Sequence, residues 1–259
     1  APRMSNVTAK SSIDLNADVG EGLDAADAAI LPLISSANIA CGGHAGDLRT
    51  MRATVALALE HGVGIGAHPG YPDREGFGRR EIDISEADLR ASVREQLQAL
   101  EAVVAEAGAR IGHVKPHGLL YNKAASDPAL AALLAEVVHG WDTGVVLVGL
   151  AGSQLLAAGR EAGLAVAAEG FADRAYEPDG SLRSRSRPGA LHEDPLDVAA
   201  KALSIARDGR APLEGEGWVD VAADTICLHG DEPRAVANAR AVRAALSEAG
   251  IELIRPGRA

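Results

Sequence analysis

The chain has 259 residues, of which 47% are hydrophobic and 3% aromatic, and its formal net charge at pH 7 is −11. This length is enough to bury a sizeable core, while the negative charge argues against nucleic acid or an anionic membrane as a partner, because both attract a basic protein face. No apolar run approaches the ~20 residues that cross a bilayer, and two cysteines cannot form a disulfide framework. We therefore expect a cytoplasmic protein.

Residues 1–11 lack the apolar run of a secretory signal and are expected to form an N-terminal extension, in which Met4 indicates that the first residues precede the native start. From residue 12 to residue 259, short apolar segments alternate with longer Ala-rich segments, without a low-complexity linker. The short segments are typical of strands: Ser12–Leu15, Ala37–Ala40, Gly64–Ala67, His113–Lys115, Val145–Val148, Ala165–Ala168 and Thr225–Leu228. The longer segments are typical of helices: Leu48–His61, Glu86–Ala107, Pro128–Trp141, Ser153–Ala162, Pro195–Asp208 and Pro233–Ala249.

Repeated strand–helix units leave two α/β architectures, a doubly wound sheet and a closed (β/α) barrel. Polar residues follow nearly every expected strand, from the first to the last. Such residues converge only if the strands form a ring, whereas an open sheet gathers those near one switch point. We therefore expect residues 12–259 to form a single-domain (β/α) barrel with seven or eight parallel strands.

The first expected strand runs into Asp14-Leu-Asn16-Ala-Asp18. Side chains alternate along an extended chain, so Asp14, Asn16 and Asp18 are expected to point to one side at the mouth of the barrel. Two carboxylates and an amide can bind a cation, or supply a base and its orienting partners. The simpler alternative is an Asx-rich turn that caps its own backbone. Glu21, further along, is expected to be exposed to solvent.

Three histidines end apolar runs and enter Gly/Pro-rich turns, in Asn38-Ile-Ala-Cys-Gly-Gly-His44, Gly64-Ile-Gly-Ala-His68 and Val114-Lys-Pro-His117. The repetition indicates one polar site built from several strand ends. His229 repeats the pattern after the last expected strand. Cys41 is expected to be a small buried residue, with a nucleophilic role as the alternative.

Lys115 precedes His117 by two residues, so both side chains are expected to face the same way. A lysine inside a barrel needs a partner carboxylate, for which we expect Asp14 or Glu169. Arginines concentrate in two loops, at 79–80 and at 174–187. They are suited to binding an anionic substrate, although solvated mobile loops would have the same composition.

We expect Asp14, His44, His68, His117 and His229 to share one pocket at the carboxyl ends of the strands. The candidate catalytic residues are Asp14, Lys115 and His117. The candidate substrate-binding residues are Asn16, Asp18, Asn38, His44, His68, Arg79, Glu169, Arg174, Arg187 and His229. If a divalent metal binds, its expected ligands are Asp14, His44 and His68.

These motifs resemble those of the LamB/YcsF family, and they match in order over nearly the whole chain. The resemblance rests on Asp14-Leu-Asn-Ala-Asp-Val-Gly-Glu, Ala37-Asn-Ile-Ala-Cys-Gly-Gly-His-Ala-Gly-Asp, Gly66-Ala-His-Pro-Gly-Tyr-Pro-Asp, Gly76-Phe-Gly-Arg-Arg, Val114-Lys-Pro-His-Gly, Glu169-Gly-Phe-Ala-Asp-Arg-Ala-Tyr and Cys227-Leu-His-Gly-Asp. Two positions depart from the family pattern, Gly43 where Phe is common and Leu119 where Ala is common. Neither change removes a polar group, so they affect the shape of the pocket more than its chemistry.

The resemblance implies a barrel related to the polysaccharide deacetylase and glycoside hydrolase-like folds. It also implies ATP-dependent opening of 5-oxo-L-proline to L-glutamate, together with separate 5-oxoprolinase subunits B and C. The chain has no Gly-x-x-x-x-Gly-Lys-Ser/Thr loop, so a partner would supply ATP-dependent activation. Two other hypotheses stay open: a metal-dependent deacetylase or amidohydrolase that acts alone, and a ligand-binding barrel without catalysis.

Overall fold

Seven parallel strands close into a ring in the computed structural model, which describes residues 10–22, 24–192, 194–228 and 234–257. The ring is formed by β1 (Ser12–Val19), β2 (Ser36–Ala40), β3 (Gly64–His68), β4 (His113–Val114), β5 (Val146–Leu150), β6 (Ala165–Phe171) and β9 (Thr225–Leu228). Pairing of β1 with β9 closes it, for example through Asp14 and Thr225. The expected single-domain (β/α) barrel is therefore confirmed, with seven strands in the ring.

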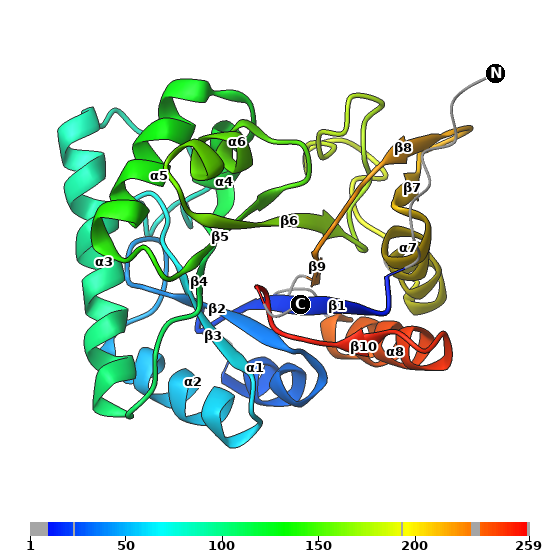
Figure 1. The fold of residues 1–259 in the computed structure, drawn as a ribbon, viewed down its shortest axis with the longest axis horizontal. Helices are drawn as coiled ribbons and strands as arrows, with labels where there is room; N and C mark the ends of the chain where they lie inside the picture. Colours follow the sequence, from blue (N-terminus) through cyan, green and yellow to red (C-terminus); the bar gives the residue numbers. More distant parts are fainter. Residues whose placement is uncertain (1–9, 23, 193, 229–233, 258–259) are drawn as a thin grey trace.

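Helices surround this ring (Figure 1). They are α1 (Asp24–Ile30), the short 3₁₀ helix η1 (Leu31–Leu33), α2 (Leu48–Glu60), α3 (Glu86–Glu106), α4 (Gly118–Ser126), α5 (Pro128–Trp141), α6 (Gln154–Glu161), α7 (Pro195–Asp208) and α8 (Ala235–Glu248). Side chains cap the first turns of α3 and α5: Ser85 accepts from Asp88 N, and Asp127 accepts from Ala129 N and Leu130 N. No helix within the described ranges is long and apolar enough to span a membrane.

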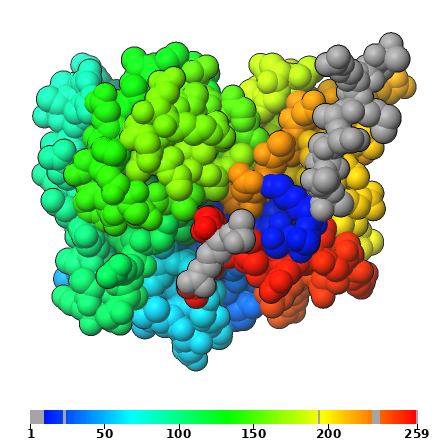
Figure 2. Space-filling model, in the orientation of Figure 1, coloured from blue at the N-terminus to red at the C-terminus, as the bar shows by residue number. Residues whose placement is uncertain are grey.

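Three short strands lie outside the ring. The strands β7 (Arg210–Pro212) and β8 (Trp218–Asp220) form an antiparallel pair between α7 and β9, and β10 (Glu252–Leu253) pairs with the start of β1. The space-filling view shows the C-terminal segment in red beside the first strand in blue (Figure 2). The helices α1 and α4 and these three strands are additional to the elements expected from the sequence, because they are short and their hydrophobic pattern is weak.

The first strand is longer than the sequence indicated. It was expected to end at Leu15, but it extends to Val19. Asp14 therefore lies near the amino end of the strand, and Asp18 lies near its carboxyl end. At ~3.3 Å per residue, the two positions are about 13 Å apart along the strand.

The inside of the barrel is polar, which explains why the strand resembled a loop in sequence. Asn16 Nδ2 donates to Glu169 Oε1 (2.9 Å) and to Thr225 Oγ1 (2.6 Å), and Asn38 Nδ2 donates to Asn16 Oδ1 (2.8 Å). The expected alternation is present, since the intervening residues Leu15 and Ala17 belong to the hydrophobic core. Buried amides are stable here because each is hydrogen-bonded to a neighbour across the ring.

Candidate functional site

Three neighbouring strands bring three histidines together. His44 lies in the loop after β2, His68 is the last residue of β3, and His117 precedes the first residue of α4 just after β4. All three side chains are buried. The loop after β3 returns across them through Gly78, where a Cβ atom would lie 2.9 Å from His44 Cβ and 3.0 Å from His117 Cδ2. Only glycine fits this close approach, and its φ of 63° also favours glycine.

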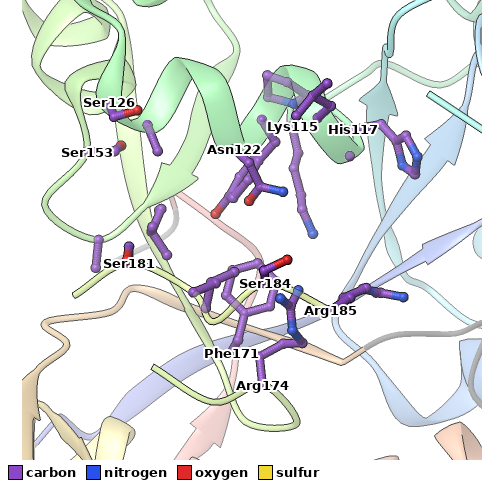
Figure 3. Close-up of a pocket in the computed structure, with 18 of the residues that line it drawn as sticks. Lys115, His117, Asn122, Ser126, Ser153, Phe171, Arg174, Ser181, Ser184 and Arg185 are labelled. Carbon is purple, nitrogen blue, oxygen red and sulfur yellow. The ribbon is translucent and has the colours of Figure 1, made fainter. Parts of the chain in front are cut away.

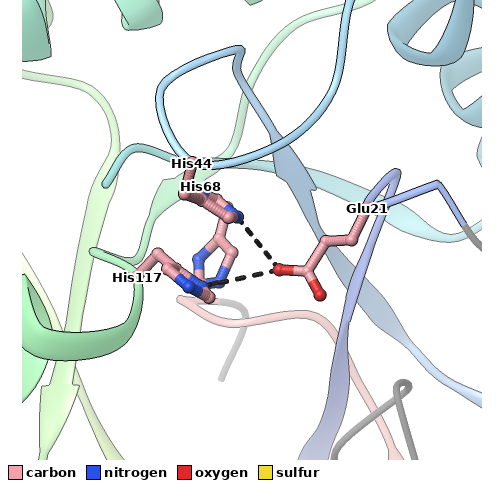
Figure 4. Close-up of side chains that lie close together, drawn as sticks. All are labelled: Glu21, His44, His68 and His117. Carbon is pink, nitrogen blue, oxygen red and sulfur yellow. Dashed lines mark hydrogen bonds and ion pairs between the residues drawn. The ribbon is translucent and has the colours of Figure 1, made fainter. Parts of the chain in front are cut away.

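The histidine rings pack against one another in a compact group (Figure 4). His44 and His117 stack with ring centroids 3.6 Å apart, and His68 lies edge-on to both. His117 Nδ1 lies 3.0 Å from His68 Nε2. Burial lowers the pKa of His117 to about 2 and lowers that of His44 as well, because each ring is withdrawn from water beside other histidines. Both rings are therefore neutral at pH 7.

Glu21 completes this group, although solvent exposure was expected for it. Its side chain is only 5% exposed, and Oε1 lies 3.0 Å from His44 Nε2 and 3.5 Å from His117 Nδ1. The expectation was wrong because Glu21 comes just after the longer β1, which places it at the mouth of the barrel. One ligand atom from each of Glu21, His44, His68 and His117 lies within 4.8 Å of the others, so these four residues could hold a metal ion.

Asp14 lies elsewhere and is held by hydroxyl groups. Ser35 Oγ (2.7 Å), Ser36 Oγ (2.8 Å) and Thr225 Oγ1 (2.5 Å) all donate to its carboxylate. Burial nevertheless raises the pKa of Asp14 to about 6. Asp14 is thus separate from the histidine group. The sequence suggested Asp14 as a metal ligand beside His44 and His68, but the residues that lie beside these two histidines are Glu21 and His117.

Lys115 lies inside the barrel, 3% exposed, between two carboxylates. Its Nζ is 3.0 Å from Asp18 Oδ1 and 3.0 Å from Glu169 Oε1. Burial opposes the charged form, but Asp18, Cys227 and Glu169 together hold the pKa of Lys115 well above its ordinary value. Of the two expected partners, Glu169 is present and Asp14 is replaced by Asp18.

A cavity of about 610 Å³ opens beside these groups (Figure 3). Its wall includes the ends of β1, β3 and β4 through Asp18, His68, Lys115 and His117. It also includes polar residues from α4, from the turn before α6 and from the loop after β6: Asn122, Ser126, Ser153, Arg174, Ser181, Ser184 and Arg185. Ser126 and Ser153 were missed in the sequence because they lie at helix ends and belong to no motif.

The arginines separate into two groups. Arg79, Arg174 and Arg185 line the cavity. Arg174 is 6% exposed, and within the described residues its Nε has no hydrogen-bond partner. By contrast, Arg187 lies outside the cavity wall, with its side chain 63% exposed and paired with Glu177 at 2.9 Å. The charge of Arg187 therefore faces solvent.

The remaining candidates from the sequence either are buried, where their hydrogen bonds hold the fold together, or fall outside the described residues. Asn16 and Asn38 belong to the hydrogen-bonded interior of the barrel. Cys41 is buried, and its sulfur accepts from His68 N at 3.3 Å. Burial raises the pKa of the Cys41 thiol to about 12, so it is not a thiolate at neutral pH. His229 lies outside the described residues.

The whole chain was compared with protein families, with named proteins and with solved structures. The model of the LamB/YcsF family matches residues 13–258. A protein of Neisseria meningitidis serogroup C, named as the A subunit of 5-oxoprolinase, is 51% identical over 93% of this chain and 98% of its own length. The crystal structure of a lactam utilization protein from Thermus thermophilus has a TM-score of 0.87 and 44% identity, covering 94% of this chain and 99% of that one.

Proteins of much lower sequence identity share the fold. The peptidoglycan deacetylase PdaC from Bacillus subtilis has a TM-score of 0.50 at 13% identity, covering 95% of this chain and 87% of that one. This likeness concerns the fold alone and agrees with the expected relation to deacetylase barrels. Together with the family match along almost the whole sequence, the close relatives show that the chain belongs to the LamB/YcsF family.

Proposed function

We propose that this protein is a component of 5-oxoprolinase, which opens 5-oxo-L-proline to L-glutamate with ATP and partner subunits B and C. The observation that carries the proposal is a cavity lined by Lys115 and three arginines, in a chain that shares half its residues with a relative named as the A subunit of 5-oxoprolinase. Its cationic wall suits a small substrate that carries a carboxylate and gains further negative charge on activation.

Arg174 is suited to bind the substrate carboxylate. Arg174 is nearly buried at the cavity wall, and its Nη2 donates to the carbonyl oxygen of Arg183 at 2.7 Å. Its Nε has no hydrogen-bond partner within the described residues. A carboxylate that accepts from Arg174 would satisfy this buried donor and fix the orientation of the lactam ring.

Activation of the lactam belongs to the partners in this proposal, because the sequence has no Walker-type loop. The partner subunits transfer the terminal phosphoryl group of ATP to the lactam oxygen, which makes the ring carbon a better electrophile. Water adds to that carbon, the ring C–N bond breaks, and the nitrogen takes a proton. A second water then releases phosphate from the resulting acyl phosphate. Arg79 and Arg185 offset the added negative charge.

Asp18 is the base that we favour for the attacking water. It lines the cavity, and Lys115 and Asn38 hold its Oδ1 at 3.0 and 2.9 Å. Asp14, one of the candidate catalytic residues named from the sequence, is not part of the cavity wall and is occupied by three hydroxyl donors. Another of these candidates, His117, lines the cavity but has both ring nitrogens within 3.0 Å of protein atoms.

The test is reconstitution with purified partners. The chain alone is expected neither to hydrolyse ATP nor to release glutamate from 5-oxo-L-proline, and addition of subunits B and C is expected to restore both activities. The group of Glu21 and three histidines favours one competitor, an amidohydrolase that acts alone with a metal. Lactam opening by the chain alone, with a divalent metal and no ATP, would replace the proposal with that competitor.

A further inference from the structure

Two of the buried histidines face each other through one ring nitrogen each, while their other ring nitrogens are held by backbone carbonyl groups. His68 Nδ1 donates to the carbonyl oxygen of Lys115 at 2.7 Å, and His117 Nε2 donates to the carbonyl oxygen of Phe77 at 2.9 Å. A carbonyl oxygen only accepts, so His68 Nδ1 and His117 Nε2 each carry a hydrogen. The nitrogens left to bind a metal ion are therefore His68 Nε2 and His117 Nδ1, which face each other across 3.0 Å.

Two carboxylate oxygens also lie close to this pair of histidine nitrogens. Glu21 Oε1 lies 3.5 Å from His117 Nδ1, and Asp18 Oδ2 lies 3.3 Å from His68 Nε2. Carboxylate oxygens only accept when ionised. One shared proton can bridge a single pair of these atoms, whereas a metal cation satisfies all of them at once. Donation of the other ring nitrogen to a backbone carbonyl is also the usual arrangement of histidines that bind metals.

The separations fit a coordination sphere. A tetrahedral ion with bonds of ~2.05 Å to nitrogen or oxygen has ligand atoms about 3.3 Å apart. Here His68 Nε2 and His117 Nδ1 are 3.0 Å apart, His44 Nε2 and Glu21 Oε1 are 3.0 Å apart, and His117 Nδ1 and Glu21 Oε1 are 3.5 Å apart. In Figure 4, the stacked rings of His44 and His117 both present a nitrogen to Glu21.

We propose that Glu21, His44, His68 and His117 bind one divalent transition-metal ion of the Zn²⁺ class. Imidazole nitrogens favour such ions over Mg²⁺ and Ca²⁺, which prefer oxygen ligands. His68 and His117 also line the cavity, so the ion borders the space in which a substrate would bind. This inference does not depend on the 5-oxoprolinase proposal, because metal binding is measured without substrate or partner subunits.

The test uses the full chain after dialysis against a chelator, with folding checked by circular dichroism. We expect one Zn²⁺ per chain after buffer exchange, measured by plasma mass spectrometry, and a rise in Tm on addition of Zn²⁺. Co²⁺ in place of Zn²⁺ should give visible absorption bands of a four- or five-coordinate ion. The variants Glu21→Gln and His68→Gln should each weaken Zn²⁺ binding by at least about 10-fold, while His61→Gln, at an exposed histidine after α2, should not.

Two results would overturn the inference. The first is a folded wild-type chain that takes up neither Zn²⁺ nor Co²⁺ in stoichiometric amount. The second is a folded Glu21→Gln chain that binds Zn²⁺ as tightly as the wild type; this variant preserves side-chain size, so its folding is expected. Loss of the metal proposal in either way leaves the reconstitution result with subunits B and C unaffected.

Discussion

Lys115 and Glu169 form an ion pair inside the barrel, with Nζ 3.0 Å from Oε1 and with side chains 3% and 0% exposed. A buried charge is tolerated only when its partner is present. The pair therefore makes Lys115 a structural residue as well as a candidate for stabilising negative charge in the cavity.

Replacement of Lys115 by Met should destabilise the protein. It leaves the buried carboxylate of Glu169 without its cation, at a cost of about 3–5 kcal/mol in the free energy of unfolding. The double variant Lys115→Met/Glu169→Gln removes the stranded charge and should regain part of this loss. Urea denaturation of both variants measures the difference. A single variant as stable as the wild type would show that the ion pair contributes nothing to the fold.

Arg174→Lys should weaken use of the substrate. A lysine cannot replace the planar pair of donors of a guanidinium, and loss of a hydrogen bond to a charged group costs about 1.5–3 kcal/mol, or roughly 10- to 150-fold in kcat/KM. Arg187→Lys is the matched control, because Arg187 lies outside the cavity wall. Steady-state kinetics of the reconstituted complex give kcat/KM for the two variants. Equal effects of the two substitutions would exclude a specific role for Arg174.

Asp14 should make stability depend on pH. Burial raises its pKa from 3.8 to about 6 in the folded state, so the folded state holds the proton more tightly than the unfolded state. The stabilising contribution is present in full below pH 3.8 and is lost as the pH rises through 6. It amounts to about 3 kcal/mol, at 1.36 kcal/mol per pKa unit.

The measurement compares the wild type with Asp14→Asn, which does not titrate. The free energy of unfolding of the wild type, relative to that of the variant, should fall between pH 4 and pH 7.5. Asp220→Asn, at an exposed position on β8, is the control substitution, because it leaves Asp14 in place. A constant difference for Asp14→Asn would show that folding does not raise the pKa of Asp14.

Gly43 and Gln96 should be energetically coupled. A Cβ on Gly43 would lie 2.3 Å from Gln96 Oε1, and the Gln96 amide donates to Gly70 O (2.8 Å) and accepts from Gly70 N (3.0 Å). Gly43→Ala should therefore displace Gln96 and cost about 1–3 kcal/mol, because buried backbone groups lose their partners. In a Gln96→Ala background the same substitution should cost less. Additive effects in this double-mutant cycle would contradict the coupling.

The sequence predicted the ring of strands well, because each strand is a short apolar segment followed by polar residues. It predicted the length of β1 poorly. The alternation of polar and apolar residues from Asp14 to Val19 is that of a strand whose inner face is polar, and the same composition is typical of a turn. The helix α4 was missed because it begins at Gly118, within Pro116-His117-Gly118, a sequence typical of a turn.

The candidate site was predictable where it depends on strand ends. His44, His68 and His117 follow adjacent strands and meet as expected. Glu21 was not predictable, because its position depends on where β1 ends and on the packing of the following turn. The separation of Arg174 from Arg187 also depends on how a long loop folds back on the barrel, which local sequence does not determine.

The most direct measurement of whether ring opening takes place in this cavity uses Asp18→Asn in the complex with subunits B and C. Glutamate and ADP are quantified in the same reaction, with Asp220→Asn as control. Loss of the base should reduce glutamate formation by about 10²–10⁴-fold, while ATP cleavage by the partners continues, so that glutamate formed per ADP falls far below the wild-type ratio. Glutamate formation at the wild-type rate and ratio would contradict catalysis at this site.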